Sequence, residues 1–269
     1  MNSSHERTQT MGANYQQIAK DARLKVLDLI YRAQVSHIGS NFSCIDILTV
    51  LFEKIDLDND KFVLSKGWVA ASLYYFLWRK GRITEEELDS FCKEGSKFIG
   101  LAEPITPDIM IAGGSMSMGL SGGVGLALAK KLKNESGKVF VLESDGGLNG
   151  GMVWESLAIA KQNHLDNLVL ILDINCLQAM GKTKDILDME PIEDKLKSFG
   201  WDWDRIDGHN YLVIEEKLNR KPRKGIPYSI ICDTIKGYPI SFMRGDNIFH
   251  YKQLSESEFS KALTELNHD

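Results

Sequence analysis

The sequence predicts an α/β domain in which a parallel sheet has helices on both faces. Two apolar runs, 139–142 and 168–174, are typical of buried strands, and the segment between them at 154–161 has a helical pattern. Strand, helix and strand in this order form a βαβ unit, whose two strands are parallel. Strand and helix patterns alternate along the rest of the chain, which indicates one α/β domain. The 269 residues, 43% of them hydrophobic, are enough for one large domain, alone or with appendages.

The remaining elements are predicted in chain order from their periodicity. Residues 1–14 are polar and are expected to form a disordered tail, so the folded domain is placed at 15–269. Apolar residues from Ile18 to Ala33 then recur at helical spacing. The later patterns predict a helix through Ile45 and Phe52, a short strand at 60–67 that ends in a glycine turn, a helix over 70–79, a capped helix start at Thr84, a small-residue helix at 122–132, a helix near 212–218, a buried strand at 228–232 and a helical tail at 255–266.

Polar residues follow both strands of the βαβ unit. The first strand leads into a glycine-rich loop at 144–151 that contains Asp145, and the second strand is followed by Asn175. Ligands of open α/β sheets bind outside the carboxyl ends of the strands, so both side chains are expected to face one crevice. The glycines allow backbone N–H groups to approach an anion at a helix N-terminus, while carboxylate and amide oxygens suit Mg²⁺ or Ca²⁺. The pattern therefore indicates a metal–diphosphate site, with turn capping by Asp145 and Asn175 as the structural alternative.

Composition argues against several classes of partner. A net charge of −5 and a pI near 5.7 argue against a nucleic-acid-binding surface, and the dense basic tract at 220–224 is interpreted as a solvated loop. No apolar run approaches the roughly 20 residues that span a bilayer, and the polar start lacks the order of a signal peptide. We therefore expect a cytoplasmic protein without membrane association. The four cysteines lack CxxC spacing, which favours reduced thiols.

The glycine-rich loop and its surroundings resemble a known enzyme family. Asp145-Gly146, followed at a distance by Asn175, is similar to the motif of thiamine-diphosphate enzymes, and 154–155, 165–168 and 175–181 resemble transketolase specifically. Further segments match that family in the same order, namely 36–39, 62–67, 114–119, 207–210 and 234–250. The chain is identified as a member of the transketolase family over about 22–250. The resemblance implies the thiamine-diphosphate-binding fold, with thiamine diphosphate and Mg²⁺ (or Ca²⁺) as cofactors.

The resemblance also implies which residues hold the metal and the cofactor. Asp145, Asn175 and the backbone carbonyl of Leu177 match the family's metal ligands. The cofactor-binding residues that it implies are Gly114, Ser115, Met116, Gly146, Asn175 and His250. Within this set Gly146 would donate its N–H to the diphosphate, and 114–116 would line the aminopyrimidine ring. Met116 is also compatible with an ordinary core position.

Two histidines match catalytic residues of the family. His37 and His250 correspond to histidines near the thiazolium ring and the substrate. An imidazole there can donate or shuttle a proton to a ketose oxygen near neutral pH. A structural role is the alternative for each, and it is favoured for His164 and His209. Glu155 matches a family carboxylate at a dimer interface, with a solvated glutamate as the alternative.

On the substrate side the chain departs from the family pattern. Trp68 stands where the family has a histidine near the cofactor phosphates, and Leu101 replaces the histidine that contacts a hydroxyl of the donor's two-carbon fragment. Ser144 replaces the first glycine of the metal motif, and Gly150 replaces a glutamate. A buried hydroxyl without a partner costs about 1–3 kcal/mol, whereas leucine accommodates a methyl group. We therefore expect a donor without that hydroxyl, such as pyruvate, and an aldehyde or ketone acceptor. Ketol transfer between sugar phosphates is the alternative.

The matched region corresponds to the first of three family domains. Full-length transketolases continue with a pyrimidine-binding domain, which supplies the glutamate for cofactor tautomerisation, and a C-terminal domain. The resemblance implies the N-terminal subunit of a split transketolase, active only with a C-terminal-half partner subunit of roughly 300 residues. We expect a heterotetramer acting on a small-molecule sugar or 2-oxoacid. The alternative classes are the α subunit of a 2-oxoacid dehydrogenase and a non-catalytic binding subunit.

Overall fold

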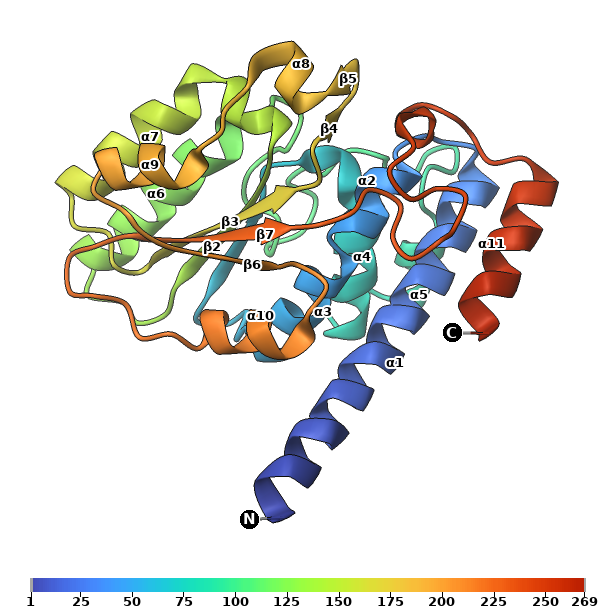
Figure 1. The fold of residues 1–269 in the computed structure, drawn as a ribbon, viewed down its shortest axis with the longest axis horizontal. Coiled ribbons are helices and arrows are strands. Elements are labelled where there is room, and N and C mark those ends of the chain that lie inside the picture. The colour runs from blue at the N-terminus through green and yellow to red at the C-terminus, as the bar shows by residue number, and fades with distance from the viewer. Residues whose placement is uncertain (1, 269) are drawn as a thin grey trace.

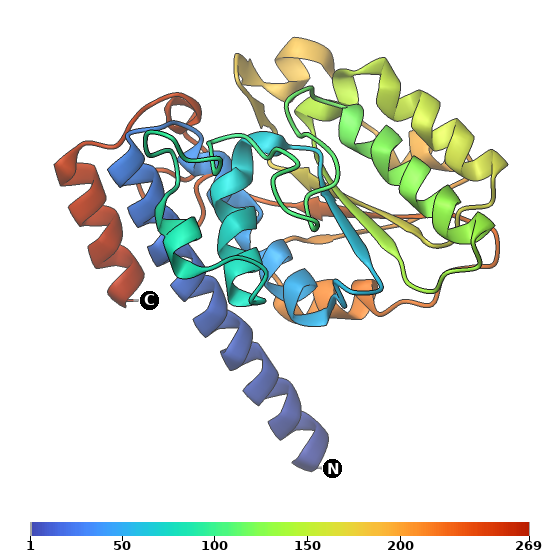
Figure 2. The same cartoon turned by 180° about the vertical axis from the view of Figure 1, so that it is seen from behind.

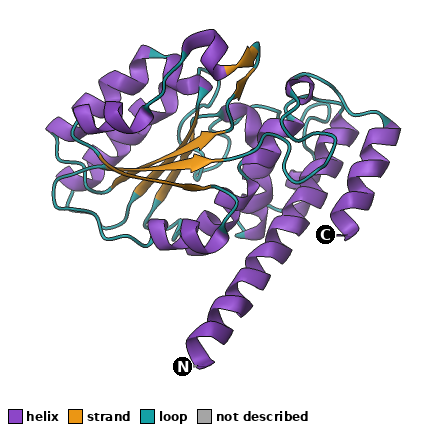
Figure 3. Cartoon of the chain, viewed as in Figure 1, coloured by secondary structure: helices purple, strands orange, loops and turns teal. Residues whose placement is uncertain are grey.

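The computed structural model describes residues 2–268, with side chains from Asn14 onward. A five-stranded sheet lies at its centre, in the order β1-β2-β3-β7-β6, and each strand is parallel to its neighbours (Figures 1 and 3). The strands are β1 (Lys61–Leu64), β2 (Val139–Ser144), β3 (Leu168–Ile174), β6 (Asp202–Asp207) and β7 (Tyr228–Asp233), with a separate antiparallel pair, β4 (Leu177–Gln178) and β5 (Gly181–Lys182). The predicted α/β class and parallel sheet are confirmed.

Helices and short 3-10 turns connect the strands. The α-helices are α1 (Asn2–Ala33), α2 (Ile38–Ser43), α3 (Ile45–Lys54), α4 (Ala70–Arg79), α5 (Glu85–Asp89), α6 (Met118–Leu132), α7 (Gly151–Gln162), α8 (Thr183–Leu187), α9 (Ile192–Ser198), α10 (Tyr211–Leu218) and α11 (Glu256–His268). The 3-10 turns are η1 (Gly67–Val69), η2 (Gly146–Asn149) and η3 (Asn247–His250). The capping pattern predicted at Thr84 is present, because its side chain accepts from the Glu87 N–H and the Glu87 carboxylate accepts from the Thr84 N–H.

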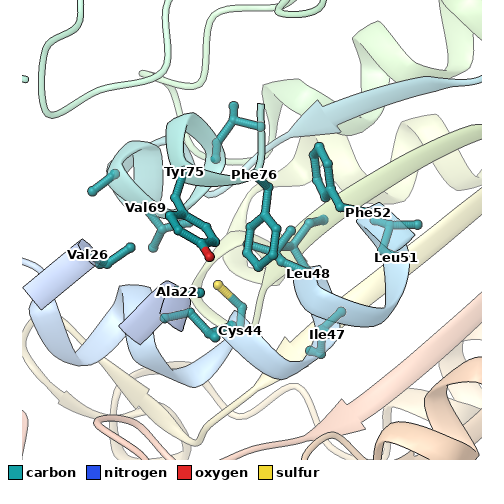
Figure 4. Close-up of a cluster of buried hydrophobic side chains, with 14 of the residues drawn as sticks. Ala22, Val26, Cys44, Ile47, Leu48, Leu51, Phe52, Val69, Tyr75 and Phe76 are labelled. Atoms are coloured by element: carbon teal, nitrogen blue, oxygen red, sulfur yellow. The ribbon is translucent and has the colours of Figure 1, made fainter. Parts of the chain in front are cut away.

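Both faces of the sheet are buried because successive strand side chains point to opposite sides. On β2, Phe140 and Leu142 join the apolar cluster that includes residues of α1, α3, α4 and α10. Val139 and Val141 join the cluster on the other face, with residues of α6, α7 and α9. Figure 4 shows part of the first cluster, in which the rings of Phe52 and Phe76 stack with centroids 5.3 Å apart. The near-continuous apolar strand sequences are thus explained by burial on both sides.

Helix α6 packs closely against the sheet because of its small residues. A Cβ atom added to Gly123 would lie 2.4 Å from Cγ2 of Val141, so a larger residue would push the helix away from β2. The helix begins at Met118, before the predicted start at 122, and follows Ser117, whose φ is 74°. The glycines near its start hide the helical pattern from sequence periodicity, because they contribute no apolar side chain.

The two terminal helices lie side by side (Figures 1 and 2). Tyr31 of α1 and Phe259 of α11 stack with centroids 4.1 Å apart. Residues 2–14, for which the sequence predicts a disordered tail, form the first turns of α1 and project away from the sheet. Tyr15 is already buried, and the domain start at 15 stays a prediction. None of the described helices is both long and apolar enough to cross a membrane.

Candidate functional site

A cavity of about 400 Å³ lies at the carboxyl edge of the sheet. It is reached by segments that follow β1, β2, β3 and β7, because parallel strands end at one edge. Of the residues singled out by sequence, the cavity is lined by His37, Trp68, Met116, Asp145, Gly146, Asn175, Leu177 and His250. Gly114 and Ser115 lie in the neighbouring loop but do not line it. The structure therefore brings the predicted metal ligands and both predicted catalytic histidines to one place.

Asp145 directly follows β2 and is almost fully buried, with 4% of its surface exposed. Its Oδ1 accepts from the Gly146 N–H at 2.8 Å, and its Oδ2 accepts from the Thr183 hydroxyl at 3.1 Å. Burial, with a further contribution from the nearby Asp173 carboxylate, raises the pKa of Asp145 to about 6. A buried carboxylate in this condition is stabilised by a bound cation.

The donor set at this edge is made of oxygen atoms. Asn175 and Leu177 line the cavity with Asp145, and the Leu177 N–H donates to Oδ1 of Asn175 at 3.1 Å. Within residues 2–268 no group of three His, Cys, Asp or Glu side chains is placed to hold a metal. One carboxylate, one amide and one backbone carbonyl suit a hard ion such as Mg²⁺, which takes further oxygens from phosphates or water. The residues present therefore fit such an ion, and their ligand role stays a prediction.

A buried ion pair lies behind the cavity wall. Lys66 follows β1, and its ammonium pairs with Asp173 on β3, which also accepts from the hydroxyl of Ser43 at 2.6 Å and from that of Thr234. Burial alone would raise the pKa of Asp173, but the Lys66 charge holds it below its usual value. The pair places a positive group at the edge where an anionic ligand is predicted.

A second lysine links the metal edge to the histidines. Lys236 Nζ lies 2.7 Å from Nδ1 of His250 and 3.3 Å from the carbonyl oxygen of Leu177. Burial, together with the charge of Lys66, lowers the pKa of Lys236 to about 8. Sequence reasoning missed Lys66 and Lys236 as site residues. Both follow strands that end at the same edge, which is the signal that could have identified them.

The two histidines form a compact aromatic group with Trp68. The rings of His37 and His250 have centroids 4.8 Å apart, and His37 stacks on Trp68 at 5.0 Å with an interplanar angle of 9°. Burial, then the charge of Lys236, lowers the pKa of His37 to about 4 and that of His250 to about 3. Both imidazoles are therefore neutral near pH 7 and can accept a proton or a hydrogen bond.

A second cavity of about 490 Å³ adjoins the first, and His37, Trp68 and Tyr251 line both. Leu101 lies in this second cavity, beside apolar residues such as Ile30 and Phe91. The apolar surroundings agree with the loss of a polar partner predicted for this position. Leu101 also approaches the 114–116 loop, since a Cβ atom on Gly114 would lie 3.1 Å from its Cδ2.

Met116 and the glycines around it define the rim of the first cavity. Met116 is 62% exposed, which excludes the alternative of an ordinary core position. A Cβ atom on Gly67 would lie 2.3 Å from the carbonyl oxygen of Gly113, so the turn after β1 and the loop before α6 touch through their backbones. The contact of Gly114, Ser115 and Met116 with a cofactor ring stays a prediction.

Comparisons with known proteins agree with these features. The sequence model described as transketolase, thiamine diphosphate binding domain, matches residues 14–269. One of the two chains of apulose-4-phosphate transketolase from Phocaeicola vulgatus is 31% identical over 257 residues, covering 91% of both proteins. Human transketolase is 29% identical over 276 residues, covering 99% of this chain and 44% of the human one. The transketolase structure from Campylobacter jejuni has a TM-score of 0.87 at 27% identity, covering 94% of this chain and 43% of that one.

Proposed function

This chain belongs to the transketolase family, and from that premise we propose that it is the N-terminal, thiamine-diphosphate-binding subunit of a split transketolase-like enzyme. The observation that supports the proposal most directly is the single cavity that Asp145, Asn175, Lys66 and two neutral histidines share. The cavity combines hard oxygen donors for a cation with buried positive charge for a diphosphate. Its histidines are near enough to each other to serve one substrate.

In this proposal the chain's own residues bind the cofactor and handle protons. Asp145, Asn175 and the Leu177 carbonyl hold Mg²⁺, and the Gly146 N–H with Lys66 faces the diphosphate. Thiamine diphosphate, when bound, supplies a nucleophilic carbon that takes up a two-carbon unit. His37 and His250, which the pKa values leave neutral, accept or return a proton at a substrate oxygen. Lys236 positions His250 through its 2.7 Å contact with Nδ1.

Exposed apolar side chains at the cavity support a partner subunit. Trp68 is 47% exposed, Met116 62%, Met180 80% and Tyr251 60%, and all four line the cavity. Large apolar groups that gather at one opening are typical of a surface that another chain covers. We propose that a C-terminal-half subunit with the pyrimidine-binding domain covers this opening, in a heterotetramer with two sites. The Phocaeicola relative is named as one subunit of its transketolase, which supports such a division.

For the donor, we propose pyruvate rather than a ketose phosphate. Leu101 lies in an apolar cavity, where a donor hydroxyl would find no partner from this residue, at a cost of about 1–3 kcal/mol. Carbon dioxide would leave pyruvate, and the remaining acetyl unit would form a carbon–carbon bond with the carbonyl carbon of an aldehyde or ketone, with uptake of one proton. Conventional ketol transfer is the second candidate, because His37 and His250 are both in place.

The donor is tested with the complex reconstituted from both subunits, thiamine diphosphate and Mg²⁺. We expect carbon dioxide release from pyruvate, and a Leu101→His variant should shift the kcat/KM ratio toward a hydroxylated donor by about tenfold or more. Ile99→His is the matched control, because Ile99 lines the same cavity and is partly exposed. Ready use of xylulose 5-phosphate by the wild type, without use of pyruvate, would refute the donor proposal.

The same preparation separates the other classes. The family match to transketolase argues against a 2-oxoacid dehydrogenase α subunit, for which turnover would depend on a lipoyl carrier protein. A non-catalytic subunit would retain thiamine diphosphate in the complex but turn over neither 2-oxoacids nor ketoses.

A further inference from the structure

Glu143 is a fully buried carboxylate beside the candidate cofactor site, to which no role has been assigned above. It lies on β2 on the same side as Val139 and Val141, where strand alternation places apolar residues against α6 and α7. A buried carboxylate is costly unless hydrogen bonds compensate it, so its contacts indicate what it does there.

Two serine hydroxyls converge on this carboxylate. Ser65 donates to Oε2 of Glu143, and Ser144 donates to Oε1 through its backbone N–H at 2.7 Å and its hydroxyl at 3.3 Å. Each hydroxyl also accepts from a backbone N–H. Ser65 accepts from Gly119 at 3.1 Å, and Ser144 accepts from Gly147 at 3.1 Å. Each serine therefore uses its donor and an acceptor at once, and relays the carboxylate to one glycine amide.

The two amides belong to the two loops that are predicted to clasp the cofactor. Gly119 begins α6 directly after the 113–117 loop, and Gly147 follows Gly146 in the turn after Asp145. Both loops also touch directly, since the Ser117 hydroxyl donates to the carbonyl oxygen of Gly147 at 2.8 Å. The carboxylate thus joins the predicted aminopyrimidine loop to the predicted diphosphate turn.

The close packing around the carboxylate explains the departures from the family motif at this turn. A Cβ atom on Gly147 would lie 2.0 Å from Oε1 of Glu143, so the turn passes the carboxylate only without a side chain. A Cβ atom on Gly150 would likewise lie 1.9 Å from the Ser117 hydroxyl oxygen. Ser144 and Gly150, which differ from the family pattern, therefore belong with Glu143 to one hydrogen-bonded unit.

We propose that Glu143 is a positioning residue, which sets the spacing between the 113–117 loop and the Gly146-Gly147 turn. It touches no cofactor atom itself and acts through Ser65 and Ser144. The proposal rests on the proposed function for the identity of the ligand, thiamine diphosphate, but not for the order of the loops.

Amide hydrogen exchange of the cofactor-free full chain tests the positioning directly. Because the amide of Glu143→Gln has one oxygen, only one relay keeps its acceptor, and we expect at least one of the Gly119 and Gly147 amides to exchange about tenfold faster or more. Ser65→Ala should accelerate Gly119 alone, and Ser144→Ala should accelerate Gly147 alone. These single-relay variants keep the test available if Glu143→Gln does not fold.

Val141→Ala is the matched control, because Val141 is fully buried on the same strand and side but contacts Gly123 rather than the loops. It should lower Tm without the selective exchange at Gly119 and Gly147. In the reconstituted complex, Glu143→Gln should raise the KM for thiamine diphosphate about tenfold and leave kcat at saturating cofactor within about twofold. Unchanged exchange at both amides in Glu143→Gln, or the same pattern in Val141→Ala, would overturn the positioning role. Altered exchange in Glu143→Gln, together with a wild-type complex that binds no thiamine diphosphate, would support the positioning and refute the proposed function.

Discussion

Replacing Asp145 by Asn separates a metal ligand from a residue that only caps a turn. Asp145 is the N-cap of η2, and its Oδ1 accepts from the Gly146 N–H. Asparagine caps about as well as aspartate, so a capping role alone predicts an unchanged unfolding free energy. If the carboxylate is kept there to bind a cation, its loss should stabilise the metal-free chain, because an unfavourable buried charge is removed.

The size of this effect follows from the pKa of Asp145. The change from an ordinary 3.8 to about 6 corresponds to roughly 3 kcal/mol of unfavourable free energy for the carboxylate at neutral pH. Asparagine keeps only one of the two acceptors, now used by Gly146 and Thr183, so part of the gain is lost. We expect the unfolding free energy of Asp145→Asn to rise by about 1–2 kcal/mol.

Urea unfolding with a chelator present measures this change as a function of pH. The folded chain takes up a proton at Asp145 more readily than the unfolded chain, so the wild-type contribution to stability falls as pH rises from about 4 to about 6. The difference between wild type and Asp145→Asn should therefore grow over this range and then stay constant. In the reconstituted complex, Mg²⁺ with thiamine diphosphate should raise the Tm of the wild type but not that of the variant. A variant with unchanged stability and an intact Mg²⁺ response would refute the ligand role.

Two further predictions concern the charged groups around the same cavity. Lys66→Met leaves the buried Asp173 with hydroxyl donors only and should lower the unfolding free energy by about 3 kcal/mol in urea titrations, and the double variant Lys66→Met/Asp173→Asn should recover most of it; a loss below about 1 kcal/mol would show that the hydroxyls suffice. Because the folded chain lowers the pKa of His37 to about 4 and of His250 to about 3, the unfolded chain binds more protons there, so their contribution to stability should fall as pH drops from about 6.5 to about 4. His37→Gln/His250→Gln should lack this component in the same titration, and an unchanged pH dependence would contradict it.

The sequence was sufficient for the parts of the site that depend on neighbouring elements. Val139–Ser144 and Leu168–Ile174 are adjacent parallel strands, so Asp145 and Asn175 had to end at one edge. The Lys66–Asp173 pair was not predictable in this way, because it depends on the order β1-β2-β3 and joins residues far apart in the chain. Sequence patterns predict strands more readily than they predict which strands become neighbours.

Short elements and charged residues inside apolar segments were missed for local reasons. Helices α2, α8 and α9 and the β4–β5 pair have too few residues for a periodicity to be visible. Glu143 stands in an otherwise apolar strand, which signals a buried polar contact, but its partners Ser65 and Ser144 are visible only in three dimensions. Tertiary hydrogen bonds decided these positions.

The most direct test of the split-enzyme proposal is turnover by this chain alone, by the C-terminal-half partner alone and by an equimolar mixture, each with thiamine diphosphate and Mg²⁺. We expect carbon–carbon bond formation only in the mixture, because this chain supplies the metal–diphosphate edge and the partner covers the opening. Turnover by this chain without any partner would contradict the proposal.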